Sequence, residues 1–275
     1  MKKKYAVLAL SFICTLAWGT VAFAASAIDG DVIEYDFRNG QAIATGNVTI
    51  TNDDGKATAK GAEYNTKTEN GKLTGSVVAD KGDAHLTCHI LNIAEAGDHL
   101  TAIGNAVLKK EDKTLRAQQV EYFGKKQYAE TVGSWAQLAM DDGSVMDSAN
   151  MNYNMASGLA HANGNVRLIS PPRKLTARAD NAVYNTKQDE GTIELIGHAT
   201  ATQDGNTVSG NTLTLKGAGG KVAIAEGNVR MYYVPKPSPP AAAMVVDARG
   251  ANNYQESRIY NWPGDTMSVG TTTIA

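Results

Sequence analysis

Three residues that lie close together in the sequence, His85, Cys88 and His89, are of the types that bind transition metals. On a strand, His85 and His89 would share a face but lie roughly 13 Å apart at about 3.3 Å per residue, which is too far to bind one ion. Cys88 would point to the opposite face. The spacing therefore predicts no metal site here.

Other signals for chemistry are weak. Paired aspartates at 53–54 and 141–142 could bind calcium, but an acidic pair beside glycine is more typical of a hairpin turn. The chain contains no G-x-S-x-G elbow, no phosphate-cradling glycine loop and no paired-carboxylate signature. We therefore predict a protein that is not an enzyme and has no cofactor.

The most regular feature of the chain is a repeat of about 30 residues. Its unit is seen at 28–50, IDGDVIEYDFRNGQAIATGNVTI, in which a turn at Asn39-Gly40 separates two alternating stretches. The glycine of the second stretch recurs at steps of 29, 29, 29, 31, 33 and 30 residues, at Gly46, Gly75, Gly104, Gly133, Gly164, Gly197 and Gly227. Each unit predicts one hairpin, so the chain should be all-β, with about seven to eight hairpins.

The alternation predicts a dry face and a wet face on each strand. Val48 and Ile50 should point inward and Asn47 outward. In the first stretch of each unit the pattern slips by one residue, as between Cys88 and Leu91, which predicts a β-bulge or corner that bends the strand. The sheet should therefore curl.

Turn chemistry predicts antiparallel hairpins. Dipeptides that tolerate positive φ lie between the alternating stretches, at Asn39-Gly40, Asn70-Gly71, Ser157-Gly158, Glu190-Gly191 and Gly219-Gly220. The alternative is a parallel β-solenoid, an exported adhesin or a carbohydrate-binding or carbohydrate-processing protein, whose rungs would not reverse after two residues.

The inward face is long and apolar, and alanine and glycine recur in it. A closed sandwich would need bulkier residues to fill the roughly 10 Å between its sheets. Small inward residues predict a groove that admits something apolar and slender. The residues predicted to line it are Tyr35, Val48, Ile50, Tyr64, Leu73, Val77, Leu100, Leu108, Leu115, Val120, Tyr122, Trp135, Met151, Tyr153, Val166, Leu168, Tyr184, Leu195, Leu213, Val229 and Met231.

The first 24 residues have the composition of a secretory signal. Three lysines precede an apolar run, and Ala22-Phe23-Ala24 is an A-x-A cleavage site. The alternative is an uncleaved membrane anchor, because the run is nearly long enough to span a bilayer. Residues 25–275 are predicted to form one domain, with loop insertions near 170–174 and 235–243.

The charge balance argues against a nucleic-acid partner. The chain has 26 basic and 28 acidic residues, and removal of the three lysines of the signal leaves 23 against 28. This mildly acidic balance is spread along the chain, whereas nucleic-acid binders concentrate basic residues.

The repeats resemble the OstA-like family of lipopolysaccharide-transport proteins. The resemblance rests on Ala59-Lys60-Gly61-Ala62-Glu63-Tyr64-Asn65 followed by Leu73-Thr74-Gly75-Ser76-Val77, on Ala179-Asp180-Asn181-Ala182-Val183-Tyr184-Asn185, and on Gly-Asn-Val triplets at Gly46, Gly164 and Gly227. It covers the chain from Ile28 to about Tyr254. The chain is longer than usual members, and it carries two proline-containing insertions.

The resemblance implies a fold, a ligand and partners. The fold is an antiparallel β-jellyroll, open along one side, whose interior holds the acyl chains of lipopolysaccharide. Such proteins lie in the periplasm and join end to end with related domains at the inner and outer membranes, which implies head-to-tail self-association. The outer-membrane member carries a large barrel for which this chain is too short, and the inner-membrane member keeps an N-terminal helix.

Overall fold

The computed structural model describes residues 27–52, 55–185, 192–216 and 222–235. Its strands and two short 3-10 helices are β1 (Ala27–Asp29), β2 (Val32–Asp36), β3 (Gln41–Asn52), β4 (Gly55–Asn65), β5 (Asn70–Lys81), β6 (Ala84–Ala94), η2 (Glu95–Gly97), β7 (His99–Lys110), β8 (Lys113–Phe123), β9 (Tyr128–Met140), β10 (Val145–Ser148), β11 (Asn150–Asn154), β12 (Leu159–Ser170), η3 (Pro171–Arg173), β13 (Leu175–Asn185), β14 (Thr192–Gln203), β15 (Asn206–Lys216), β16 (Val222–Glu226) and β17 (Arg230–Tyr232). No helix within these ranges is long and apolar enough to cross a bilayer. The signal-peptide prediction lies outside the described residues, as does the end of the chain from residue 236 onward.

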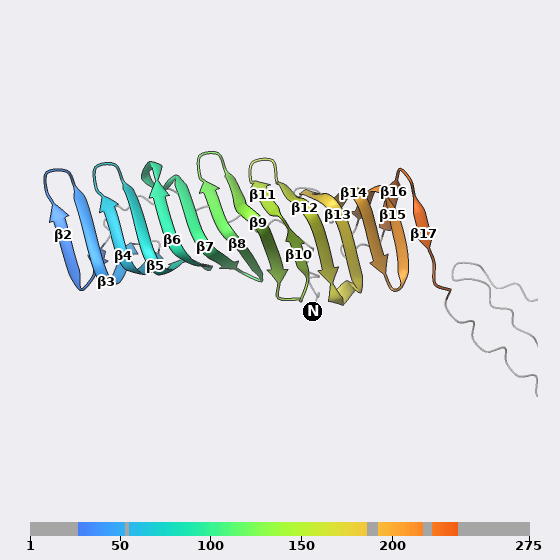
Figure 1. Cartoon of the computed structure of the whole chain (residues 1–275), viewed down its shortest axis with the longest axis horizontal. Helices are drawn as coiled ribbons and strands as arrows, with labels where there is room; N and C mark the ends of the chain where they lie inside the picture. The colour runs from blue at the N-terminus through green and yellow to red at the C-terminus, as the bar shows by residue number, and fades with distance from the viewer. Residues whose placement is uncertain (1–26, 53–54, 186–191, 217–221, 236–275) are drawn as a thin grey trace, which may run out of the picture. The chain divides into compact units, whose positions relative to one another are not determined.

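The strands form one antiparallel meander in which each long strand pairs with the long or short strands before and after it (Figure 1). At three places in the sheet, two short strands lie end to end beside the same long strand. β1 and β2 both pair with β3, and β16 and β17 both pair with β15. β10 and β11 both pair with β9 on one side and with β12 on the other. All pairs of described strands are antiparallel, so the prediction of antiparallel hairpins is confirmed. The parallel-solenoid alternative is wrong.

Two consecutive residues in the left-handed conformation form the corner of five of the long strands, β3, β5, β7, β12 and β14. In β3, Gly46 has φ +73° and Asn47 has φ +46°. The ladder with β4 is interrupted there, so that these two residues face Lys60 alone, a two-against-one bulge that bends the strand. Consecutive positive φ values recur at Gly75-Ser76, Gly104-Asn105, Gly164-Asn165, Gly197-His198 and Gly227-Asn228. The predicted curl is confirmed, but the extra residue of the bulge lies in the second stretch of the unit and not in the first, as where Gly75 and Ser76 oppose His89 alone. The repeated glycine is explained by the conformation of the corner.

The corner requires glycine for space as well as for φ. At Gly164, φ is +78° and an added Cβ would lie 2.9 Å from the Cβ of Ala149. We expect Gly164→Ala to lower the free energy of unfolding by about 2–3 kcal/mol, because a left-handed conformation and a close contact add up. Urea denaturation measures this change.

Two further variants distinguish the cost of the left-handed backbone from the cost of the close contact with Ala149. Gly82 has φ +58° with nothing within 4 Å of an added Cβ. Gly82→Ala should therefore show only the backbone cost of about 1 kcal/mol. Adding Ala149→Gly to Gly164→Ala should recover the remainder, and a double variant as unstable as the single one would show that the contact is unimportant.

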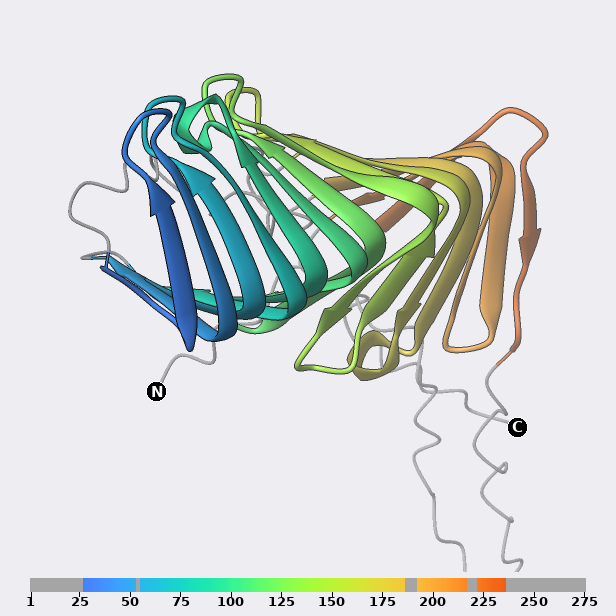
Figure 2. The same ribbon diagram turned by 60° about the vertical axis from the view of Figure 1, so that its left-hand side comes forward.

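The corners fold the sheet over on itself, so that the two halves of each long strand lie in two facing layers (Figure 2). Residues from both sides of a corner enter the same core, as Ala44 and Val48 do in β3. The fold is thus an antiparallel β-jellyroll whose apolar core lies between the layers.

One predicted turn is placed wrongly. Asn70 and Gly71 lie in β5, paired with Asn65 and Tyr64, so they are not in a turn. The chain reverses just before them, where the amide of Glu69 donates to the carbonyl of Asn65 at 2.8 Å. Glu69 adopts φ +55° and so takes the place that Gly40 has in the preceding hairpin. Ser157-Gly158 is a turn as predicted, whereas Glu190-Gly191 and Gly219-Gly220 lie outside the described residues.

Candidate functional site

The space between the layers is the candidate site, and most of the predicted lining residues are buried in it. Leu108, Leu168 and Leu195 are nearly inaccessible to solvent, and they come from β7, β12 and β14. One core therefore runs through much of the sheet without a break. The predicted residues that are buried are Val48, Ile50, Leu73, Val77, Leu100, Leu108, Leu115, Val120, Tyr122, Met151, Tyr153, Val166, Leu168, Tyr184, Leu195 and Leu213.

Four predicted residues lie outside this core. Tyr35 in β2, and Val229 and Met231 near the other end, are exposed because these end segments have neighbours on one side only in the described sheet. Trp135 is exposed because residues 133–135 of β9 all oppose Gln118, one residue more than at the other corners. The extra residue reverses the alternation, so Ala136 takes the inward place. Tyr64 is half-buried.

Several core residues were missing from the predicted lining. Leu138, Met140, Leu175, Ile193 and Leu215 are buried with the rest. Ile193 and Leu215 each lie two residues from a predicted residue of the same strand, so alternation extended to the strand ends would have found them. Leu138, Met140 and Leu175 are separated from the predicted residue of their strand by a corner, where the alternation shifts.

The interior has little free volume. A cavity of about 30 Å³ lies between Leu86, Leu91, Leu100, Leu108 and Tyr122. A second, of about 130 Å³, lies near the N-terminal end, between Ile28, Ile50, Tyr64, Leu73 and Ile93 among others. An apolar cavity of similar size can hold a molecule such as benzene, so neither cavity holds a long chain as it stands.

The titratable groups inside the layers are held neutral. Burial raises the pKa of the Tyr184 phenol, and burial followed by the charge of Asp98 raises that of Tyr122. Burial also raises the pKa of the Cys88 thiol to about 11. The interior is thus an apolar compartment without an ionised group of these kinds at neutral pH.

The side chains first considered for metal binding lie apart from one another. His85 contacts Asp80 through Nδ1 and Oδ1 at 2.6 Å, while Cys88 is buried. The side chain of His89 lies over Gly104 at a corner. Among the described residues, no three His, Cys, Asp or Glu side chains are grouped to hold a metal ion.

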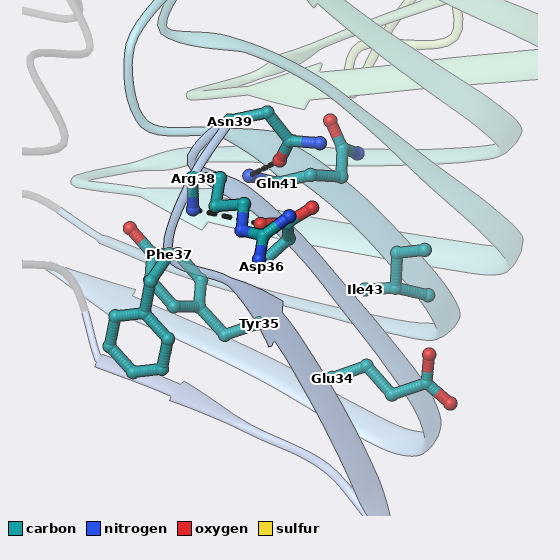
Figure 3. Close-up of a pocket in the computed structure, with 8 residues that line it drawn as sticks. All are labelled: Glu34, Tyr35, Asp36, Phe37, Arg38, Asn39, Gln41 and Ile43. Carbon is teal, nitrogen blue, oxygen red and sulfur yellow. Dashed lines mark hydrogen bonds between the residues drawn. The ribbon is translucent and has the colours of Figure 1, made fainter.

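A separate hollow lies outside the layers, at the β2–β3 hairpin (Figure 3). It has a volume of about 640 Å³ and is lined by Glu34, Tyr35, Asp36, Phe37, Arg38, Asn39, Gln41 and Ile43. The rings of Tyr35 and Phe37 meet edge to face, with centroids 4.8 Å apart. The carboxylate of Asp36 accepts from the amide of Arg38 at 2.8 Å, which orders the tip of the hairpin.

Part of the chain matches a known protein family. Residues 91–221, from within β6 to beyond β15, match the model of the family described as LptA/(LptD N-terminal domain) LPS transport protein. These residues, just under half of the chain, are similar to that family. The resemblance seen in the repeats is thereby confirmed.

One solved structure aligns over most of the chain. It is LptH, the LptA homologous periplasmic component of the conserved lipopolysaccharide transport device from Pseudomonas aeruginosa, at 12% identity over 78% of this chain and 99% of that chain, with a TM-score of 0.15. The comparison with curated proteins found no match.

Proposed function

We propose that this protein is a non-enzymatic carrier that holds the acyl chains of lipopolysaccharide between its two layers and bridges the inner and outer membranes. The observation that carries the proposal is the unbroken apolar core between the layers, in a chain whose family is that of lipopolysaccharide transport. Acyl chains are long and apolar, and they fit a long compartment better than a single pocket.

The small residues of the core support this function. Ala106, Ala117, Ala160, Ala162 and Ala199 are completely buried on strands β7, β8, β12 and β14. Alanine projects little from the sheet, so two layers faced with alanine leave room once they are moved apart. Bulky residues would refill that room from either side.

Loading requires the layers to separate, because the cavities between them are small. The corners are the natural hinges: each is a bulge at which the ladder between strands is interrupted, and glycine there tolerates a wide range of φ. Movement about this line of corners would open the interior without breaking the ladders within either layer.

Photo-crosslinking tests whether the ligand occupies the interior. A crosslinking residue at Leu108 or Val166, both buried, should capture lipopolysaccharide. Lys109, next to Leu108, is exposed and serves as the matched control that should not. The corner asparagines make poorer controls, because Asn105 and Asn165 have positive φ that a larger residue would strain. Equal capture at Lys109 would contradict an interior site.

We further propose that the protein acts in the periplasm after removal of residues 1–24, and that its ends join like-folded domains. Exposed apolar residues at both ends of the described sheet support end-to-end joining, among them Ile33 on β2 and Met231 on β17. An unpaired strand edge offers backbone donors and acceptors to a partner strand. Such a joint would make the apolar interiors of successive domains continuous.

A further inference from the structure

One outer face of the sheet carries a row of arginines. The strand register places one residue from each of eight strands side by side, in the order Arg116, Gln137, Asp147, Arg167, Arg178, Thr200, Ser209 and Arg230. All four arginines are exposed. The chain as a whole has a net charge of −2, so this row separates positive charge onto one face.

Two of these arginines are directly opposite each other. Arg167 on β12 pairs in register with Arg178 on β13, and these strands are neighbours in the sheet (Figure 1). Side chains at such positions have Cβ atoms about 5 Å apart, and like charges there destabilise a sheet. The ion pairs of the described residues include neither arginine. The fold itself therefore gains nothing from this pair.

The like-charged pair on the other layer differs. Glu121 and Glu130 are also opposite each other, but both accept hydrogen bonds from within the chain. Glu121 accepts from Gln119 at 2.6 Å, and Glu130 accepts from the hydroxyl of Tyr128 at 3.0 Å. Both carboxylates therefore have partners within the chain. Arg167 lies in register between Asp147 and Arg178, and neither arginine forms an ion pair among the described residues, which leaves both guanidinium groups available to an anion outside the chain.

An exposed tryptophan lies beside the row. Trp135 is two residues before Gln137, which pairs with Arg116, and its side chain is 40% exposed. Alternation places Trp135 on the same face as Gln137. Tryptophan next to arginine is the combination that favours the headgroup region of a bilayer, where an amphipathic ring and a cation both find partners.

We propose that the outer face around Arg116, Trp135, Arg167 and Arg178 docks onto the anionic headgroups of a lipid bilayer. The N–H groups of a guanidinium can donate two parallel hydrogen bonds to phosphate oxygens. Two arginines on neighbouring strands can bind one phosphate from both sides. Arg116 and Arg178 are four strand steps apart, roughly 19 Å at the usual strand spacing, which spans several headgroups. This site is on the outside of the sheet and is independent of the proposed interior site for acyl chains.

Vesicle sedimentation tests the proposal with the full chain after export. Vesicles of phosphatidylglycerol mixed with phosphatidylcholine should bind the protein at low salt, and phosphatidylcholine alone should not. Arg178→Glu should weaken binding on the order of 30-fold, since each surface charge near an anionic bilayer counts for about one kcal/mol. Lys72→Glu is the control: it makes the same change of charge on the other layer, opposite Glu63, and should change binding less than about threefold.

The Tm of Arg178→Glu distinguishes loss of the binding surface from loss of folding. The substitution turns a like-charged pair with Arg167 into an opposite-charged one, so Tm should not fall. Equal losses for Arg178→Glu and Lys72→Glu would mean that net charge alone acts, and they would overturn the site. Binding to immobilised polyglutamate without binding to anionic vesicles would also overturn it, in favour of an acidic protein partner. Loss of interior crosslinking would leave this outcome unchanged, so the two proposals fail separately.

Discussion

Replacing Leu108 with alanine is expected to lower the free energy of unfolding by about 3 kcal/mol, within the usual range of about 2–5 kcal/mol for a buried leucine. Leu108 is 1% exposed and borders the cavity of about 30 Å³ between the layers. The substitution enlarges that cavity, and the surrounding strands are fixed by ladders on both sides, so they cannot collapse into it. Urea denaturation followed by circular dichroism measures the loss.

The control for Leu108→Ala is the same substitution at the next residue. Lys109→Ala, on the exposed face of the same strand, should change stability by less than about 0.5 kcal/mol. Leu108→Ala should still load lipid, because it adds space, whereas Leu108→Trp should load less because it fills the space. A Leu108→Ala variant as stable as the parent would show that the interior is loosely packed, contrary to the burial seen there.

The alternation of apolar and polar residues alone predicted most of the strands and most of the residues that point into the core. Leu73, Leu108 and Val166 were placed correctly because a period of two fixes which face a strand residue occupies. The corner conformation could not be read in this way. Gly46 lies two residues from each of the inward residues Ala44 and Val48, so the alternation made it look like an inward strand residue. In the structure it is a corner residue with φ +73°.

Errors in the predicted site have two physical sources. Trp135 was misplaced because one extra corner residue reverses the alternation, and composition does not reveal how many residues a bulge contains. Tyr35 and Met231 have the right parity but no second neighbouring strand, and the sequence does not say which strands end a sheet. The small volume between the layers was also not predictable, because it depends on how closely they approach.

The two ends of the described sheet share exposed apolar residues. On β2, Val32 and Ile33 are exposed near the acidic Asp31 and Glu34. Strands β16 and β17 expose apolar residues next to the basic Arg230. The described sheet ends at this side with β16 and β17, which both pair with β15.

Placing a lysine on either edge is expected to abolish growth of larger species. Ile33→Lys and Met231→Lys each introduce a charge where a partner strand would have to pack, and edge lysines block strand addition. Both residues are exposed, so folding should be unaffected. Val132→Lys, an exposed apolar position on the inner strand β9, is the matched control and should associate as the parent does.

Sedimentation velocity over a concentration series measures this association. The parent and Val132→Lys should grow with concentration, and the two edge variants should stay small. Mixing Ile33→Lys with Met231→Lys should give dimers and nothing longer, because each variant keeps one intact end and only one productive joint can form. Long species in that mixture would mean that association does not use these edges. A chain truncated after Pro240 that still grows would assign the joint to β16 and β17 instead of to the residues beyond them.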